Sequence, residues 1–279
     1  MAPYSLSIIS NQKDTRIMRV IRSLVGWLVV SFLLSLPVFA GGSSTEVFIL
    51  AIERVKHAVV PVLCGRIDEK RQFIVQMIDG TGFFIDSEGR FITAAHVIKG
   101  LSIVNAQQPF PCVWAIYVPD GGWQRDATTF STHWFLFGSC EMDDGLDLAV
   151  CKTVAVPKGI KPLFIEDSRP VDGTPVAFTG FPLGSVEPLS SRGNVATYRG
   201  ATDQEGSREL VIDKGTWPGA SGSPVYGEDG NVLGIVLQRG LGDGIGISVA
   251  RPSHFITTFL RSKGITVAAR RDKNKKHKQ

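Results

Sequence analysis

Short apolar runs recur along the chain from residue 59 to residue 249, and most are followed by a turn signal of Gly, Asp or Pro. The chain has 30 Gly and 15 Pro in 279 residues, above the roughly 12% that is usual for globular proteins. Short runs at this spacing predict an all-β sandwich or barrel, and the lack of alternating helical patterns disfavours a doubly wound sheet. We expect strands at 59–64, 73–78, 82–85, 91–93, 113–118, 133–137, 146–151, 176–179, 195–198, 210–212, 225–226, 232–237 and 245–249.

Two segments with helical spacing flank this series of strands. Residues 46–57 repeat apolar side chains every three to four positions after a polar stretch that can cap a helix. Residues 252–260 predict a closing helix. Residues 158–170 are rich in Pro and charge and divide the body, so 45–157 and 171–268 are two candidate β units.

The N-terminal segment has the organisation of a secretory signal. Residues 24–40 are apolar, follow Arg16, Arg19 and Arg22, and end at the small residue Ala40. We expect residues 1–40 to be a cleaved signal peptide and the protein to be exported to the periplasm or beyond the cell. An uncleaved membrane anchor is the alternative, because seventeen residues is about the shortest apolar length that spans a bilayer.

Four cysteines follow the signal: Cys64, Cys112, Cys140 and Cys151. In an oxidising compartment we expect at least one disulfide, and four cysteines leave three pairings open. None of the cysteines or histidines has the short spacing of a zinc-ligand motif. The sequence therefore predicts no metal and no cofactor.

The basic character of the chain is concentrated at its ends. The net charge is +4, yet residues 270–279 hold six Lys or Arg against one Asp, and residues 1–40 hold four against one. The remaining body is therefore mildly acidic, and we predict no nucleic-acid partner; a solvated tail fits residues 270–279, with a binding arm as the alternative. The hydrophobic content of 43% is enough for a sizeable core and excludes a largely disordered chain.

Ser221 lies in the sequence GASGSP (219–224), just before an apolar run. Glycines beside a serine allow a tight turn that exposes the hydroxyl, and such a turn lets the N–H groups of Gly219 and Ser221 point at one spot, as an oxyanion hole requires. An ordinary Gly/Ser loop is the alternative. Because position 223 is Ser, the segment is not the G-x-S-x-G elbow of α/β-hydrolases.

A serine nucleophile needs a base, and the base needs an orienting carboxylate. His96 ends a predicted strand after two small alanines, so its ring can face a cleft. Asp147 lies inside the apolar run 146–151, where an unpaired charge is costly to bury, so it needs a partner. A packed core histidine and a structural acid are the alternatives.

These three segments together resemble the trypsin-like serine peptidases. TAAH (93–96), DLAV (147–150) and GASGSP (219–224) match the family's histidine, aspartate and serine motifs in the same order. The closest resemblance is to the bacterial HtrA/DegP-like and glutamyl-endopeptidase-like branch, and it covers about residues 50–260. Three further segments resemble that branch: GTGF (80–83), GFPLG (180–184) and Asp213.

The resemblance implies two six-stranded antiparallel β-barrels with the active site between them. It implies a secreted endopeptidase in which Ser221 attacks the peptide carbonyl, His96 moves the proton and Asp147 orients His96. The N–H groups of Gly219 and Ser221 would form the oxyanion hole. A catalytically silent binding protein with the same fold is the alternative.

Three departures from the family pattern stand out. Ala220 replaces the Asp of trypsin that pairs with a new N-terminus, so we expect a preformed site or one ordered by another route. The chain after Ser221 is too short to add a PDZ domain, so a PDZ-driven oligomer is not expected and the oligomeric state stays open. No cysteine follows His96 directly, unlike in the animal enzymes.

Specificity is partly readable from the resemblance. The family's primary pocket would be walled by residues 215–218, 235–239 and 244–247, with Thr216 as in glutamyl endopeptidases. A substrate strand would pair with the backbone near Val236 and Leu237. These walls suggest a small or medium apolar substrate side chain, with an acidic one as the alternative because Arg239 is near.

Overall fold

The computed structural model describes residues 44–107, 112–119, 132–200, 209–239 and 246–266. The expected signal segment 1–40 and the basic tail 270–279 lie outside these residues. Within the described part of the chain, no helix is both long and apolar enough to cross a membrane.

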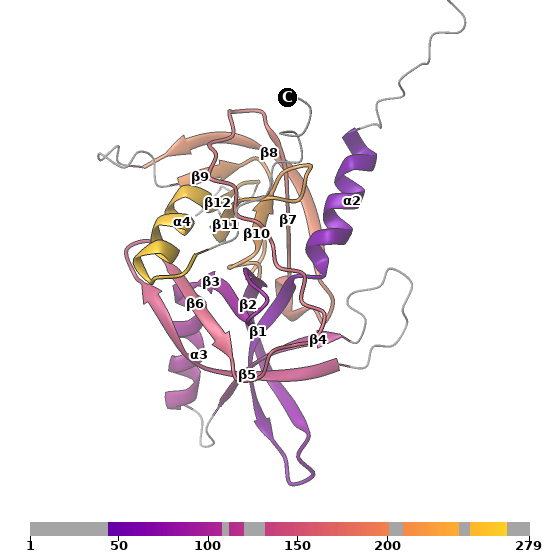
Figure 1. The fold of residues 1–279 in the computed structure, drawn as a ribbon, viewed down its shortest axis with the longest axis vertical. Coiled ribbons are helices and arrows are strands. Elements are labelled where there is room, and N and C mark those ends of the chain that lie inside the picture. The colour runs from indigo at the N-terminus through magenta and orange to yellow at the C-terminus, as the bar shows by residue number, and fades with distance from the viewer. Residues whose placement is uncertain (1–43, 108–111, 120–131, 201–208, 240–245, 267–279) are drawn as a thin grey trace, which may run out of the picture. The chain divides into compact units, whose positions relative to one another are not determined.

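Six antiparallel strands form the first closed barrel, which we call barrel one (Figure 1). Its strands are β1 Val59–Ile67, β2 Phe73–Phe84, β3 Arg90–Ala94, β4 Val113–Pro119, β5 Thr132–Asp143 and β6 Leu148–Thr153. Their order around the barrel is β1-β2-β3-β6-β5-β4. Alternate side chains point inward, so Phe83, Phe91 and Ile116 are fully buried in the core.

Barrel two repeats this architecture with the next six strands. They are β7 Pro175–Gly180, β8 Leu189–Arg199, β9 Glu209–Ile212, β10 Pro224–Tyr226, β11 Val232–Arg239 and β12 Ser248–Pro252, in the order β10-β11-β12-β9-β8-β7. The core of barrel two is mainly aliphatic, with Val176, Ile212 and Val225 fully buried. The two closed barrels confirm the predicted all-β fold.

Helices cover the outside of the barrels. Helix α2, Ser44–Lys56, packs against β7 and buries the side chains of Phe48 and Val55. Helix α4, Ser253–Ser262, follows β12 and buries Phe255, Ile256 and Phe259. Both of these helices were expected from the apolar spacing, and both are present.

A third helix, α3 at Ala95–Gln107, was not predicted. It starts directly after β3, so His96 lies in its first turn and not at the end of a strand. The buried side chains of Val97, Ile98 and Leu101 have helical spacing, but the short run that holds them is equally compatible with a strand.

Strand β2 is continuous, although two strands with a turn at Asp79 and Gly80 were predicted. The polar residue and the glycine mark a β-bulge instead of a turn. Val62 pairs with Gly80 and Leu63 pairs with Ile78, so Asp79 is the extra residue on β2. A bulge bends a strand and redirects a side chain without ending the strand. The last strand, β12, also begins three residues later than the predicted run 245–249.

Two disulfides are present, which confirms the expectation of at least one and settles the pairing. Cys64 of β1 is bonded to Cys112, just before β4, and Cys140 of β5 is bonded to Cys151 of β6. β1 is paired with β4, and Cys140 and Cys151 face each other across adjacent strands. Both disulfides therefore cross-link barrel one.

Candidate active site

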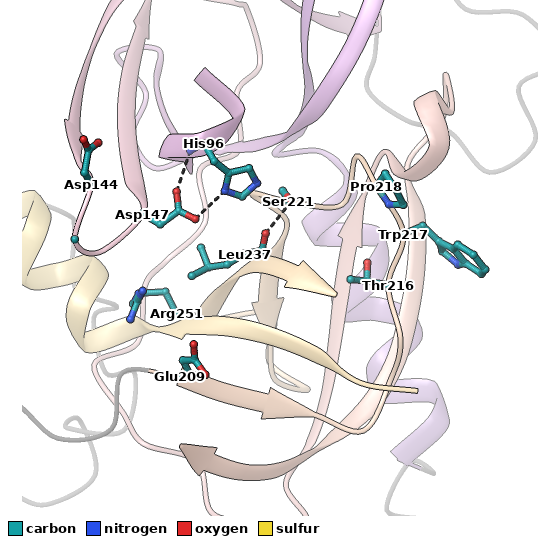
Figure 2. A pocket seen from close by; sticks show the side chains of 11 residues that line it. His96, Asp144, Asp147, Glu209, Thr216, Trp217, Pro218, Ser221, Leu237 and Arg251 are labelled. Carbon is teal, nitrogen blue, oxygen red and sulfur yellow. Dashed lines mark hydrogen bonds and ion pairs between the residues drawn. The ribbon is translucent and has the colours of Figure 1, made fainter. Parts of the chain in front are cut away.

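An open pocket of about 540 Å³ is lined by residues of both barrels (Figure 2). It brings together five residues that the sequence analysis named as site residues: His96, Asp147, Thr216, Ser221 and Leu237. The lining residues are His96, Asp144, Gly145, Asp147, Glu209, Thr216, Trp217, Pro218, Ser221, Leu237 and Arg251.

Strand register brings His96 and Asp147 together. Ala94, the last residue of β3, pairs with Leu148, the first residue of β6. His96 follows the end of β3 and Asp147 precedes the start of β6, so the two lie at the same end of adjacent strands. Asp147 is thus not inside an apolar strand, as the run 146–151 had predicted, but in the turn before it.

Asp147 holds His96 at two points. Its Oδ2 lies 2.7 Å from His96 Nδ1, and its Oδ1 accepts the backbone N–H of His96 at 2.9 Å. An ionised carboxylate can only accept hydrogen bonds, so Nδ1 carries the proton and Nε2 is left as the acceptor. The ring lies between Asp147 and Ser221 (Figure 2). The carboxylate thereby fixes both the orientation and the tautomer of the imidazole.

The turn that carries Asp147 is itself held in place. Asp147 has a φ of 57°, in the left-handed region, which Asp tolerates better than most residues. The Asp147 carbonyl accepts the N–H of Ala95 at 3.1 Å. Arg251 of β12 donates from Nε to the carbonyl of Leu146 at 2.8 Å, so a residue of barrel two supports a turn of barrel one.

Ser221 lies on a tight turn before β10, between two glycines with positive φ. Gly219 has a φ of 92° and Gly222 a φ of 88°. A side chain at Gly222 would meet the Thr81 carbonyl at 1.9 Å, so only glycine fits there. The Ser221 hydroxyl donates to the Leu237 carbonyl at 2.8 Å. A rotation of this side chain is therefore needed before the hydroxyl can donate to His96.

Hydrogen bonds fix the peptide planes around Gly219 and Ser221. The Pro218 carbonyl accepts the N–H of Leu183 at 2.6 Å, and the Ala220 carbonyl accepts the N–H of Ser223 at 3.0 Å. In a trans peptide the C=O and N–H point in opposite directions. The N–H groups of Gly219 and Ser221 therefore point away from these partners.

The predicted substrate-contacting residues are only partly at the pocket. Thr216 and Leu237 line it. Val236 does not: it is fully buried, its N–H donates to Ser223 and its carbonyl accepts from Gly222. Of the predicted walls, residues 244–245 and the Arg239 side chain lie outside the described residues.

Sequence reasoning missed the lining residues Arg251 and Glu209, whereas Trp217 lies in the predicted wall 215–218. Arg251 is only 7% exposed, and a basic residue in the apolar run ISVAR (247–251) was the available signal of a buried role. Trp217 is 59% exposed beside the serine turn. Asp213, quoted for the resemblance, does not line the pocket. Hydrogen bonds from Asn194 hold the pKa of Asp213 below its usual value.

A second carboxylate lies near His96. Burial raises the pKa of Asp79, the bulge residue of β2, and the nearby His96 partly opposes this rise. A side chain at Gly100 of α3 would meet Asp79 Oδ2 at 2.4 Å, so the carboxylate packs against the helix that carries His96. Among the described residues, no three His, Cys, Asp or Glu side chains gather to hold a metal ion.

Comparison with known proteins agrees with this fold. The family model of the trypsin-like peptidase domain matches residues 80–235. Serine protease HTRA1 of Xenopus tropicalis is 26% identical over 223 residues, which cover 75% of this chain and 41% of that protein. Serine protease HTRA4 of Homo sapiens is 29% identical over 220 residues, which cover 76% of this chain and 41% of that protein. An uncharacterized protein, y4bJ of Sinorhizobium fredii, is 29% identical over 164 residues, 57% of this chain and 22% of that protein.

The chain thus spans less than half the length of these curated relatives. A solved structure, the active form of the Rv3671c protease from M. tuberculosis, superimposes with a TM-score of 0.54. The alignment covers 78% of this chain and 86% of that one at 19% identity, so it supports the fold alone. With the family model matching more than half of its residues, the chain belongs to the trypsin-like peptidase family, and serine proteases HTRA1 and HTRA4 are among the proteins it is similar to.

Proposed function

We propose that the protein is a serine endopeptidase that hydrolyses protein or peptide substrates with Ser221, His96 and Asp147. The observation that carries this proposal is that Asp147 accepts two hydrogen bonds from His96, in the pocket that also contains Ser221. A histidine fixed with Nε2 as acceptor beside a serine on a glycine turn is the arrangement that nucleophilic catalysis needs. No cofactor or metal enters the reaction.

In the proposed reaction, His96 Nε2 takes the proton of the Ser221 hydroxyl as its oxygen attacks the peptide carbonyl. The N–H groups of Gly219 and Ser221 stabilise the negative oxygen that forms. His96 then gives the proton to the departing amine, which leaves an acyl-enzyme on Ser221. Water, deprotonated by His96, releases the acyl group and restores the serine.

Substrate binding would also free the serine hydroxyl. The Leu237 carbonyl, which accepts that hydroxyl, is the acceptor that a substrate strand paired at this edge would use. A substrate N–H bonded to Leu237 would take the place of the hydroxyl and leave it to turn towards His96. Since the backbone of Val236 is bonded within barrel two, we assign this contact to Leu237 and not to Val236.

We further propose a substrate side chain that is small or medium and apolar, accommodated beside Thr216, with an acidic side chain as the alternative if Arg239 faces the pocket. We assign the peptidase domain to residues 45–268. Residues 1–40 would direct export, or retain the protein at the membrane if uncleaved. The two disulfides favour an oxidising compartment such as the periplasm or the exterior.

A fluorescent peptidyl phosphonate, which reacts only with an activated serine, tests the proposal. It should label the wild type and not Ser221→Ala. Ser223→Ala is the matched control, because Ser223 is two residues away, fully buried, and its hydroxyl has no hydrogen-bond partner among the described residues. We expect Ser223→Ala to be labelled like the wild type. An unlabelled wild type, or equal labelling of Ser221→Ala, would contradict the proposed activity.

A further inference from the structure

One buried threonine of barrel one holds the serine turn of barrel two. Thr81 of β2 is fully buried. Its backbone N–H donates to the Ser221 carbonyl at 2.8 Å, and its hydroxyl donates to the Gly219 carbonyl at 2.8 Å. Thr81 therefore bonds both residues whose N–H groups would form the oxyanion hole.

The Thr81 hydroxyl also joins the turn to a third segment. It accepts the N–H of Phe181 at 2.9 Å. Phe181 precedes the short 3₁₀ turn Pro182–Gly184, and the N–H of Leu183 in that turn donates to the Pro218 carbonyl. The Thr81 hydroxyl thus donates one hydrogen bond, to Gly219, and accepts another, from Phe181.

The position of Thr81 is in turn tightly constrained. Its carbonyl accepts the Thr93 hydroxyl at 2.6 Å. A side chain at Gly180 would lie 2.7 Å from the Thr81 hydroxyl oxygen, and one at Gly222 would lie 1.9 Å from its carbonyl oxygen. Because Gly180 and Gly222 have no side chains, they leave room for Thr81. The close packing around it restricts Thr81 to one position.

These contacts matter because Gly219 can change conformation at low cost. Glycine has access to backbone angles on both sides of φ = 0, so the peptide before Gly219 can rotate and turn its N–H away from the site. The donors from Thr81 and Leu183 fix the carbonyls on both sides of Gly219. Ala220, where trypsin has an Asp, is buried and cannot form an ion pair that would do this.

We propose that Thr81 is the positioning residue that keeps the Gly219–Ser221 turn in its oxyanion-binding conformation. The proposal rests on the proposed peptidase function and names the other route by which the site is ordered without the Asp of trypsin. Thr81 does not contact the reacting atoms. It acts through the carbonyls of Gly219 and Ser221, from the opposite barrel.

Thr81→Val tests the role of the hydroxyl, because valine has nearly the same shape and no donor. Losing one oxyanion donor costs about 100- to 1,000-fold in kcat, and a donor that is misdirected for part of the time should cost about 10- to 100-fold. We expect kcat on a peptide amide to fall by that factor with KM little changed. Affinity for a peptide boronate, whose tetrahedral adduct places an oxygen in the hole, should fall in parallel.

Thr81→Ser keeps the hydroxyl and should stay within about threefold of the wild type in kcat. Thr179→Val is the matched control: Thr179 is also fully buried, and its hydroxyl bonds those of Ser190 and Tyr226 within barrel two. We expect Thr179→Val to lower the melting temperature without changing kcat or boronate affinity. Thr81→Ala provides a second loss of the hydroxyl if the valine variant does not fold.

The outcomes separate this proposal from the proposed function. A wild type that the phosphonate does not label contradicts the peptidase function itself. A labelled wild type with Thr81→Val or Thr81→Ala equal to it in kcat and boronate affinity overturns the role of Thr81. The role is also overturned if Thr81→Ser is as impaired as the valine variant, or if Thr179→Val loses kcat to the same extent.

Discussion

The two barrels have the same strand order but are held together differently. Barrel one contains both disulfides, Cys64–Cys112 and Cys140–Cys151, and an aromatic core in which Phe91 makes edge-on contacts with Phe84 and Phe137. Barrel two contains none of the four cysteines, and its core cluster is mainly Val, Leu and Ile. Barrel one is therefore cross-linked covalently, whereas barrel two is held by packing, hydrogen bonds and an ion pair between Arg199 and Glu209.

The difference matches the part of the site that each barrel carries. Barrel one positions His96 and Asp147 at the ends of two paired strands. Barrel two presents Ser221 on a glycine turn whose conformation depends on hydrogen bonds from Thr81 and Leu183. The comparison teaches that substitutions at the histidine side should act on proton transfer, whereas those in the cross-links should act on folding. The predictions below test this division.

The largest effect should follow from Asp147→Asn. Asn has only one acceptor oxygen for the two N–H groups that Asp147 binds, so with that oxygen on the His96 backbone N–H its NH2 group faces Nδ1 and favours the wrong imidazole tautomer. We therefore expect kcat to fall about 10⁴-fold with the fold intact. Steady-state kinetics and a melting curve measure both. Asp167→Asn is the control, because Asp167 is an exposed acid that lies 3.7 Å from Arg261, outside the pocket. A loss of less than tenfold in Asp147→Asn would contradict the role of this carboxylate.

Removal of the disulfides should come next and should leave the chemistry in place. The bonds close loops with sequence separations of 48 and 11 residues, for which chain entropy gives about 4 and about 3 kcal/mol. We expect Cys64→Ala/Cys112→Ala to lose more unfolding free energy in urea than Cys140→Ala/Cys151→Ala.

Both double variants should still react with the phosphonate below their melting temperatures, because neither bond contacts the pocket. Loss of labelling in a variant that is still folded would break the division between the barrels. It would mean that the cross-links shape the site itself.

Local patterns were enough to predict an all-β fold with two β units, both flanking helices and the segments of His96, Asp147 and Ser221, whereas the two six-stranded barrels were implied by the family resemblance. These features depend on neighbours in the sequence: apolar runs, turn residues, and glycines beside a serine. The bulge at Asp79 could not be predicted, because a polar residue before a glycine suits a turn equally well. The helix after His96 was missed since its apolar run was too short to distinguish a helix from a strand.

Contacts between the barrels were beyond local patterns. Thr81 and Gly219 are 138 positions apart, and Arg251 and Leu146 are 105 apart. Nothing in the segment GTGF indicates that its threonine bonds the serine turn. The disulfide pairing was open for the same reason, because it depends on which strands are adjacent.

A medium effect should follow from Arg251→Met, which keeps an apolar stem and removes the donor to the Leu146 carbonyl. A hydrogen bond from a charged donor contributes about 1.5–3 kcal/mol, and its loss should loosen the turn that carries Asp147. We expect kcat to fall about tenfold, which is about 1.4 kcal/mol. Arg261→Met is the control, because it removes an exposed cation whose ion pair among the described residues is with Asp167. Equal kcat in the two variants would exclude support of Asp147 across the barrels.

The smallest effects should come from two aspartates, one in each barrel, with opposite signs. Burial raises the pKa of Asp79 in barrel one, so folding favours its protonated form; this contribution is present below the unfolded pKa and is lost as the pH rises through the folded value. Hydrogen bonds from Asn194 lower the pKa of Asp213 in barrel two, so its contribution is present above the unfolded pKa and is lost as the pH falls through the folded value.

At pH 7, Asp79→Asn should therefore stabilise the protein and Asp213→Asn should destabilise it, each by less than about 1 kcal/mol. Urea unfolding at pH 7 and at pH 3 measures both, and the two differences from the wild type should shrink at the lower pH because both carboxyls then approach the neutral state that Asn mimics. Equal signs at pH 7 would show that the two carboxyls do not lie in the contrasting environments described for the two barrels.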